Sequence, residues 1–117
     1  MRAILQPFAY TVTETAVREC LHLKSAVTTL DDTRLLVNPQ WIDRAAFDGF
    51  TLIDVAPEEP SAANVLRLED RLIVASAFPR TADRVAALGL SVERVDASEL
   101  AKAEGALTCC SLIVRRI

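Results

Sequence analysis

The stretch Arg71-Leu72-Ile73-Val74-Ala75-Ser76 decides the fold, because it predicts a strong apolar strand from which its neighbours can be ordered. Pro79 opens a predicted helix after it, and residues 90–95 then alternate as a further strand. Before it, residues 63–68 predict another strand, joined to the central one by the turn Glu69-Asp70. The order is therefore strand, strand, helix, strand.

The same order occurs once before in the chain. Its predicted elements are a strand at 21–30, a turn at Asp31-Asp32, a hairpin arm at 34–38, a helix at 40–47 opened by Pro39, and a strand at 50–55. The two units match at an offset of 40 residues: Pro39 with Pro79, Asp43-Arg44 with Asp83-Arg84, Ala46 with Ala86, Gly49 with Gly89, and Val55 with Val95. The turn acids match at an offset of 38, which indicates an indel of two residues. A fixed period near 40 is typical of repeat folds; the alternative is an α+β sandwich with coincidental symmetry.

The ends of the chain predict incomplete units. Residues 10–15 predict a strand, Ser98 caps a short helix that ends at Gly105, and residues 106–117 predict a closing strand. The fold class is α/β, and residues 1–117 form a single partial domain with modules at about 21–56 and 62–96. Since stacked units need about three repeats or closure to bury every face, we expect a part of something larger.

Composition excludes several classes of function. The 117 residues carry a net charge of −3, which argues against nucleic acid or an anionic membrane as the partner. No apolar run approaches the ~20 residues of a membrane helix. Three cysteines, two of them adjacent, form a poor disulfide set and favour a cytoplasmic protein. With one histidine and no CxxC pair we expect no structural metal.

Cys109 and Cys110 are the candidate nucleophiles. A thiolate is a strong nucleophile whose reactivity is set by its surroundings. On a strand, adjacent side chains point to opposite faces, so at most one of the two would face a site. The alternative is that both are buried core residues, as free cysteines commonly are.

His22 is the sole histidine and the candidate base near neutral pH. On the predicted strand it shares a face with Lys24, while Leu21 and Leu23 point the other way. The alternative is a surface histidine without a role. Cys20 is interpreted as filler, the turn and helix acids as solvent-exposed, and Glu58-Glu59 as a charged linker.

Three motifs give the chain a family resemblance. Leu21-His22-Leu23-Lys24-Ser25, Glu99-Leu100-x-Lys102 and Gly105-x-Leu107-Thr108-Cys109-Cys110-Ser111, in this order, resemble the C-terminal half of dimethylarginine dimethylaminohydrolase, or dimethylargininase. Further likeness lies at Asn38-Pro39, at 62–64 and at 78–80. The resemblance implies the pentein fold, in which five strand–strand–helix–strand modules surround a pseudo-fivefold axis, and it runs from about residue 5 to the end.

The resemblance also implies a cysteine hydrolase of linear amidines that converts N-methylated arginine to citrulline and methylamine or dimethylamine. Cys109 matches the nucleophile, His22 the general acid/base, and the backbone carbonyl of Ala103 the contact to the amino-acid end of the substrate. No cofactor is implied, and the family belongs to arginine metabolism and nitric oxide regulation. The acids that orient the histidine and hold the guanidinium lie outside this chain, so we expect the chain alone to be inactive.

Two other functions stay open. One is a related pentein, either an arginine deiminase or an amidinotransferase. The other is a non-catalytic half-propeller that associates with itself, because incomplete modules leave strand edges exposed. The partner of this chain is then either a further copy of it or a missing N-terminal half.

Overall fold

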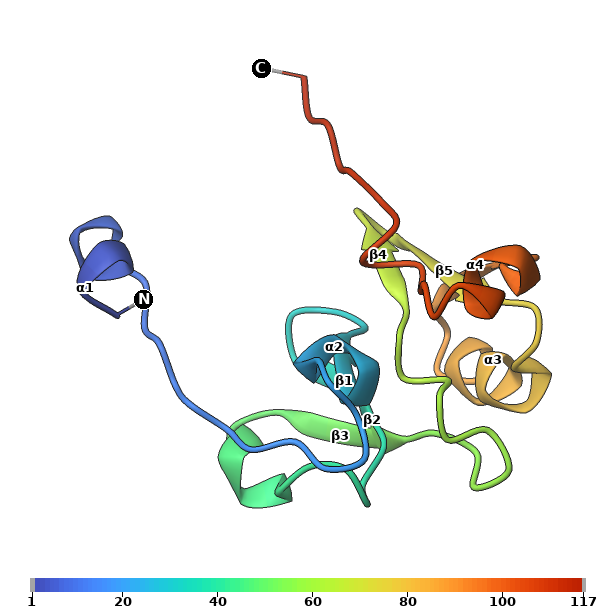
Figure 1. Ribbon diagram of the computed structural model, residues 1–117, viewed down its shortest axis with the longest axis horizontal. Helices are drawn as coiled ribbons and strands as arrows, with labels where there is room; N and C mark the ends of the chain where they lie inside the picture. The colour runs from blue at the N-terminus through green and yellow to red at the C-terminus, as the bar shows by residue number, and fades with distance from the viewer. Residues whose placement is uncertain (1, 117) are drawn as a thin grey trace.

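The computed structural model describes residues 2–116 (Figure 1). Its elements run α1 (Arg2–Leu5), η1 (Gln6–Phe8), α2 (Leu23–Ala26), β1 (Val27–Thr29), β2 (Arg34–Val37), η2 (Arg44–Phe47), β3 (Thr51–Asp54), β4 (Leu66–Leu68), β5 (Arg71–Ala75), α3 (Pro79–Ala86), β6 (Ser91–Val95) and α4 (Ser98–Lys102). They form two three-stranded sheets, ordered β1-β2-β3 and β4-β5-β6. We call these sheets, with their crossovers, the first unit and the second unit.

The two units have the same topology. In each, the first two strands are antiparallel, and a crossover returns the third strand parallel to the middle one. The middle strands start their parallel ladders in equivalent register, Arg34 against Thr51 and Arg71 against Ser91. The strand–strand–helix–strand order predicted from the sequence is therefore confirmed in both units.

The crossovers differ between the units. Residues 38–50 join β2 to β3 through the short 3-10 helix η2, whereas residues 76–90 join β5 to β6 through α3. The predicted helix at 40–47 is thus wrong for its first half, which forms a turn and a bridge from Ile42 to Val17. Both crossovers end at a glycine with positive φ, Gly49 at 93° and Gly89 at 85°, a conformation that glycine adopts at little cost.

A core shared by both units lies between the sheets. This inter-unit core consists of Leu30, Leu36, Val55, Ala62, Ala63, Val65, Leu72, Val74, Ala82 and Val85. A smaller outer core covers the other face of the first sheet and consists of Ala26, Val27, Leu35, Val37 and Ile42. Alternation along β2 divides its side chains, because Leu36 joins the inter-unit core while Leu35 and Val37 join the outer core.

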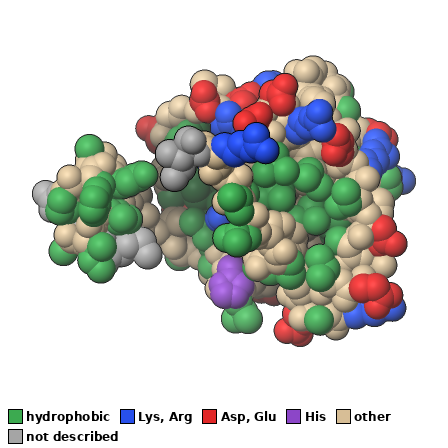
Figure 2. All heavy atoms as spheres, turned by 90° about the horizontal axis from the view of Figure 1, so that it is seen from above, with side chains coloured by type: hydrophobic (Ala, Val, Ile, Leu, Met, Phe, Trp, Pro, Cys, Tyr) green, Lys and Arg blue, Asp and Glu red, His purple; other side chains and the backbone are tan. Residues whose placement is uncertain are grey.

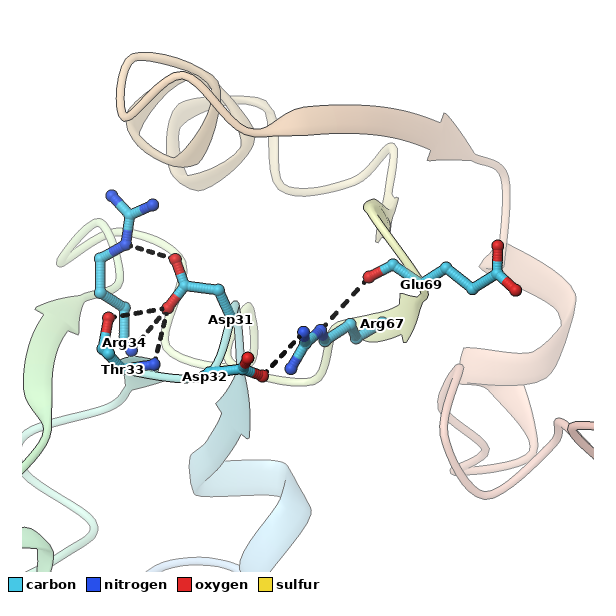
Figure 3. A network of polar contacts seen from close by, with 6 residues as sticks. All are labelled: Asp31, Asp32, Thr33, Arg34, Arg67 and Glu69. Carbon is cyan, nitrogen blue, oxygen red and sulfur yellow. Dashed lines mark hydrogen bonds and ion pairs between the residues drawn. The ribbon is translucent and has the colours of Figure 1, made fainter.

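Polar contacts also join the units. The Thr28 hydroxyl on β1 donates to the Ala63 carbonyl and accepts from the Val65 amide, which fixes the segment that enters the second sheet. Near the hairpin turns, Arg67 on β4 pairs with Asp32 at 3.0 Å (Figure 3). Asp31 closes its own turn by accepting from the amides of Thr33 and Arg34.

Three strand predictions are wrong, and a fourth, at 63–68, is right only for Leu66–Leu68. Residues 10–15 are irregular, and residues 21–26 form a turn followed by α2, so only Val27–Thr29 of the predicted strand at 21–30 is a strand. The predicted closing strand is a turn at 107–110 followed by residues 111–116, which have no strand partner in the described part of the chain. The pattern of β-branched residues predicted strands here, but strands also need a neighbouring edge.

The N-terminal arm stands away from the two units (Figure 1). The arm contains α1 and η1, and its side chains Ile4 and Phe8 are about 70% exposed (71% and 70%). It raises the radius of gyration to 14.5 Å, against about 13 Å for a compact chain of this length. Within residues 2–116 there is no helix with the length and hydropathy needed to span a membrane.

Candidate active site

Cys109 lies in a tight turn, not on a strand. We call residues 106–110 the thiol turn: the Cys110 amide donates to the Ala106 carbonyl across it at 3.1 Å. The Cys109 Sγ contacts the backbone of Ala106 twice, accepting from its amide at 3.1 Å and donating to its carbonyl at 3.4 Å. Because this segment is a turn, the prediction that the two cysteines occupy opposite faces of a strand is wrong. Both cysteines are exposed, so neither is a core residue.

The turn gives the two thiols different acidities. The hydrogen bond from the Ala106 amide lowers the pKa of the Cys109 thiol below its usual value, and the neighbouring Cys110 thiol adds to this effect. The hydrogen bond between the two thiols has the opposite effect on Cys110, because the Cys109 thiol raises the pKa of Cys110. Cys109 is therefore the thiol of the pair that more readily becomes the thiolate, the nucleophilic form.

His22 lies at the N-terminal boundary of α2, in a segment that we call the histidine turn (residues 22–25). Its carbonyl accepts from the Ser25 amide at 3.0 Å, and its backbone is extended. Since the segment is a turn, the predicted strand face shared with Lys24 does not exist. Figure 2 shows the His22 side chain on the surface, beside apolar side chains. Within residues 2–116 its ring makes no hydrogen bond, to Cys109 or to any acid.

Asn64 ties the histidine turn to the thiol turn. Its side-chain amide donates to the Lys24 carbonyl at 3.0 Å and to the Thr108 hydroxyl at 2.8 Å, and its side-chain oxygen accepts from the Thr108 amide at 3.1 Å. Asn64 is buried (9% exposed) and precedes Val65 of the inter-unit core. Thus one side chain from the linker between the units holds the neighbours of both His22 and Cys109.

A cavity of about 400 Å³ adjoins both turns. Its lining comprises Leu23, Lys24, Val27, Thr28, Thr29, Leu35, Phe47, Phe50, Val65, Leu66, Arg67, Thr108 and Ile113. The two charged residues of this lining are basic, and no carboxylate of the described chain is among them. A cationic guanidinium needs carboxylates for binding, so this cavity by itself does not suit one.

Ala103 lies just after α4, in the segment that leads into the thiol turn. It is exposed, and its amide donates to the Leu100 carbonyl at 3.1 Å. The predicted short helix is confirmed as α4, which ends at Lys102, but the predicted cap is wrong, because the N-cap is Ala97 and Ser98 is the first helical residue. No group of three or more histidine, cysteine or acidic side chains suited to a metal ion occurs in the described residues.

Two features of this site were missed by sequence reasoning. Asn64 was noted only as part of the family resemblance at 62–64. An asparagine that follows two alanines in an otherwise apolar stretch does, however, indicate a buried side chain that forms hydrogen bonds. Glu59, interpreted as part of a charged linker, is buried and accepts from the amides of Arg80 and Thr81 at the start of α3. No local pattern around Glu59 indicates this role, because the helix that it caps begins 20 residues later, at Pro79.

The fold and the sequence both match known enzymes. In sequence, the chain is 33% identical over 112 residues (96% of it) to dimethylarginine dimethylaminohydrolase of Pseudomonas aeruginosa, and 36% identical over its whole length to that of Streptomyces coelicolor. The chain spans less than half of these relatives, 44% and 45%. No known protein-family profile matches it.

Comparison with solved structures likewise matches the chain to part of longer enzymes. The Pseudomonas aeruginosa enzyme, as a cysteine-to-serine variant with citrulline, superposes with a TM-score of 0.82 at 31% identity and covers 91% of this chain and 42% of that one. A histidine-to-glycine variant, as an adduct with S-methyl-L-thiocitrulline, gives 0.83 at 31% identity over 92% and 42%. An amidinotransferase from Microseira wollei gives 0.85 at 21% identity over 98% and 37%, a likeness of fold alone.

These matches define the class first: the chain carries part of the pentein fold, with two of its strand–strand–helix–strand modules complete. Within that class, sequence and structure agree on one group. The chain is similar in sequence and structure to part of the dimethylarginine dimethylaminohydrolases, over less than half of their length.

Proposed function

We propose that this chain supplies the nucleophile and the general acid/base for hydrolysis of N-methylated arginine to citrulline and methylamine or dimethylamine. The observation that carries this proposal is the tie through Asn64, which holds the turn of the sole histidine against the turn of the more acidic thiol. Homology to hydrolases solved with citrulline and with S-methyl-L-thiocitrulline supports the substrate class.

The chemistry follows from the two side chains. The Cys109 thiolate attacks the guanidinium carbon and forms a tetrahedral adduct, and His22 gives a proton to the methylated nitrogen as its bond to carbon breaks. His22 then takes a proton from water, which adds to the carbon of the remaining thiouronium. Cleavage of the carbon–sulfur bond releases citrulline and restores the thiolate. The Ala103 carbonyl would accept a hydrogen bond from the substrate's α-ammonium group.

The chain does not hold every group that this reaction needs. Within residues 2–116 no acid forms a hydrogen bond or ion pair with the His22 ring, and the charged side chains that line the cavity are Lys24 and Arg67. Carboxylates that bind the guanidinium therefore come from outside these residues, either from further modules of the propeller or from a second copy. We expect this chain alone to turn over no substrate. We assign the reaction to the cytoplasm, since all three thiols are free.

A cationic electrophile tests the proposal. A haloacetamidine resembles the guanidinium, whereas iodoacetamide has similar reactivity without the charge, and mass spectrometry locates either label. We expect the thiol turn to direct both reagents to Cys109 ahead of Cys20, with a further preference for the amidine where carboxylates complete the site. The His22→Ala variant should lose that preference, and the Cys20→Ser variant should keep it. Equal labelling of Cys109 and Cys20 at every pH would contradict the proposal.

Methylated and unmodified arginine distinguish the related enzymes. Citrulline formed from N-methylated arginine, by this chain together with its missing modules, would support a dimethylargininase. Citrulline from arginine itself would indicate a deiminase, and transfer of the amidino group to an amine would indicate an amidinotransferase.

Self-association is a second candidate, because the apolar segment 111–116 pairs with no strand among the residues that the structure describes. Leu112 is 89% and Val114 83% exposed in the extended segment that ends the described chain. Sedimentation velocity over a wide concentration range would detect association through such an edge. Dimers without any preference of Cys109 for the amidine would support a binding module over a catalytic one.

A further inference from the structure

The two adjacent thiols of the thiol turn lie close enough together to react with each other. Their Sγ atoms are 3.8 Å apart, and both are exposed. We propose that Cys109 and Cys110 are a site of reversible oxidation, in which Cys110 resolves an oxidised Cys109 as a disulfide between neighbouring residues. This inference goes beyond the proposed hydrolysis and does not depend on it, because the chemistry needs the two thiols alone.

The chemistry has two steps. The Cys109 thiolate attacks hydrogen peroxide, gains one oxygen atom as sulfenic acid and releases hydroxide. The Cys110 sulfur then attacks the Cys109 sulfur, forming the S–S bond, and the sulfenic oxygen leaves as water with the thiol proton. The sulfurs lose two electrons in total, which peroxide accepts. An accessible, acidic thiol beside a second cysteine is the arrangement of reversible redox sites.

The lack of a side chain at Gly105 leaves room for the Cys110 sulfur. A Cβ built on Gly105 would lie 2.9 Å from the Cys110 Sγ and 3.0 Å from the Leu100 carbonyl oxygen. Atoms at such separations must move, so any other residue would push the Cys110 thiol or the end of α4 away. Gly105 thus lets the Cys110 thiol lie beside that of Cys109.

Ring closure between adjacent residues makes the product easy to reduce. The Cα atoms of neighbouring residues lie about 3.8 Å apart across a trans peptide, whereas disulfides favour about 4.4–6.8 Å. The resulting strain makes the bond more oxidising than a structural disulfide, so a cellular thiol can reopen it. The pair would therefore protect Cys109 from irreversible oxidation.

Peptide mass mapping tests the inference on the whole chain. Trypsin cleaves after Lys102 and Arg115, so both thiols fall in one peptide, 103–115, whereas Cys20 falls in the peptide 19–24. After limited peroxide and blocking of free thiols, we expect peptide 103–115 to lose two hydrogen atoms and to escape alkylation. Dithiothreitol should restore both thiols.

The variants decide which thiol resolves. In Cys110→Ser, which keeps Cys109 and changes one atom, we expect Cys109 to proceed to sulfinic acid and to lose its recovery by dithiothreitol. The control Cys20→Ser should behave as the natural chain does. Sulfinic acid at Cys109 in the natural chain at the same rate as in Cys110→Ser would overturn the inference, as would a peroxide-induced link between peptides 19–24 and 103–115. Neither outcome bears on amidine labelling, so the proposed hydrolysis stands or fails separately.

Discussion

The two units share one topology but differ in how their crossovers are held. In the second unit, α3 buries Thr81, Ala82 and Val85 against the sheet, and the distant Glu59 carboxylate caps its first amides. In the first unit, η2 buries none of its residues, and only the exposed Asp43 caps it. Strand pairing can thus be repeated while the crossover varies.

The difference reflects where each unit finds its buried surface. The first sheet is covered on both faces because β2 divides its side chains between the inter-unit core and the outer core. The first sheet therefore needs less buried apolar surface from its crossover helix. The second unit contributes Leu72 and Val74 to the inter-unit core and relies on α3 to complete it. The candidate active site lies where the units meet, at Asn64.

Truncating Leu36 should have the largest effect, because its fully buried side chain serves both units. We expect Leu36→Ala to lower the free energy of unfolding by about 3 kcal/mol. Trp41 fluorescence should report the first unit, and far-ultraviolet circular dichroism the secondary structure of the whole chain, of which α3 is the longest helix. In Leu36→Ala both signals should shift together in urea. The neighbouring Leu35 points into the outer core, against which Trp41 packs. Leu35→Ala should therefore shift the Trp41 fluorescence transition more than the circular dichroism transition. Equal effects on both signals in Leu35→Ala would contradict two separable cores.

Removing the distant helix cap should separate the two crossovers. In Glu59→Ala the amides of Arg80 and Thr81 lose a charged acceptor, so we expect unfolding to become easier by about 2 kcal/mol. The matched change Asp43→Ala in the first unit should cost roughly 0.5 kcal/mol, because that cap is exposed. Chemical denaturation measures both. Similar losses would show that the crossovers are equally dependent on their caps.

Breaking the tie between the histidine turn and the thiol turn should increase the mobility of these turns more than it lowers the stability of the fold. In Asn64→Ala the Lys24 carbonyl and both Thr108 groups lose their partner, so we expect several-fold faster hydrogen exchange of the Thr108 amide and altered alkylation rates at Cys109. Asn38→Ala is the control, since that buried asparagine contacts Gln40 and Pro60 away from both turns. An unchanged Cys109 rate in Asn64→Ala would remove Asn64 from the site.

Acid should weaken the hairpin turn of the first unit through Asp31. Hydrogen bonds from Thr33 and Arg34 lower the pKa of Asp31 from 3.8 to about 2. Since the folded pKa is depressed, the stabilisation is present above pH 4 and is lost as the pH falls from about 4 to about 2. Asp31→Asn should flatten this small slope in the free energy of unfolding. If the slope in Asp31→Asn equals that of the unsubstituted chain, the pH dependence comes from other acids.

The sequence predicted the parts of the fold that depend on local patterns. Both hairpins, the return strands and the glycines that end the crossovers followed from alternation and turn residues. The failures at residues 10–15 and 106–116 share a cause, since strand-like side chains alone do not make a strand. Their pairing depends on neighbours rather than on composition.

The candidate site was predicted in its residue types but not in its geometry. Cys109 and His22 are predicted site residues, chosen because the chain has one pair of adjacent thiols and one histidine. Their placement on strands was wrong, because tight turns at 20–25 and 106–110 are held by long-range contacts from Asn64. A contact between residues 44 positions apart has no local signature.

The most direct test of a single site is the resonance of the sole histidine. With one histidine in the chain, the ring signals in a nitrogen–proton correlation spectrum belong to His22 without ambiguity. Alkylation of Cys109 by the amidine introduces a cationic group at the thiol turn, and we predict that the His22 ring signals move on labelling in Cys20→Ser. Ring signals that stay in place while Cys109 is fully labelled would show that the two residues do not share a site.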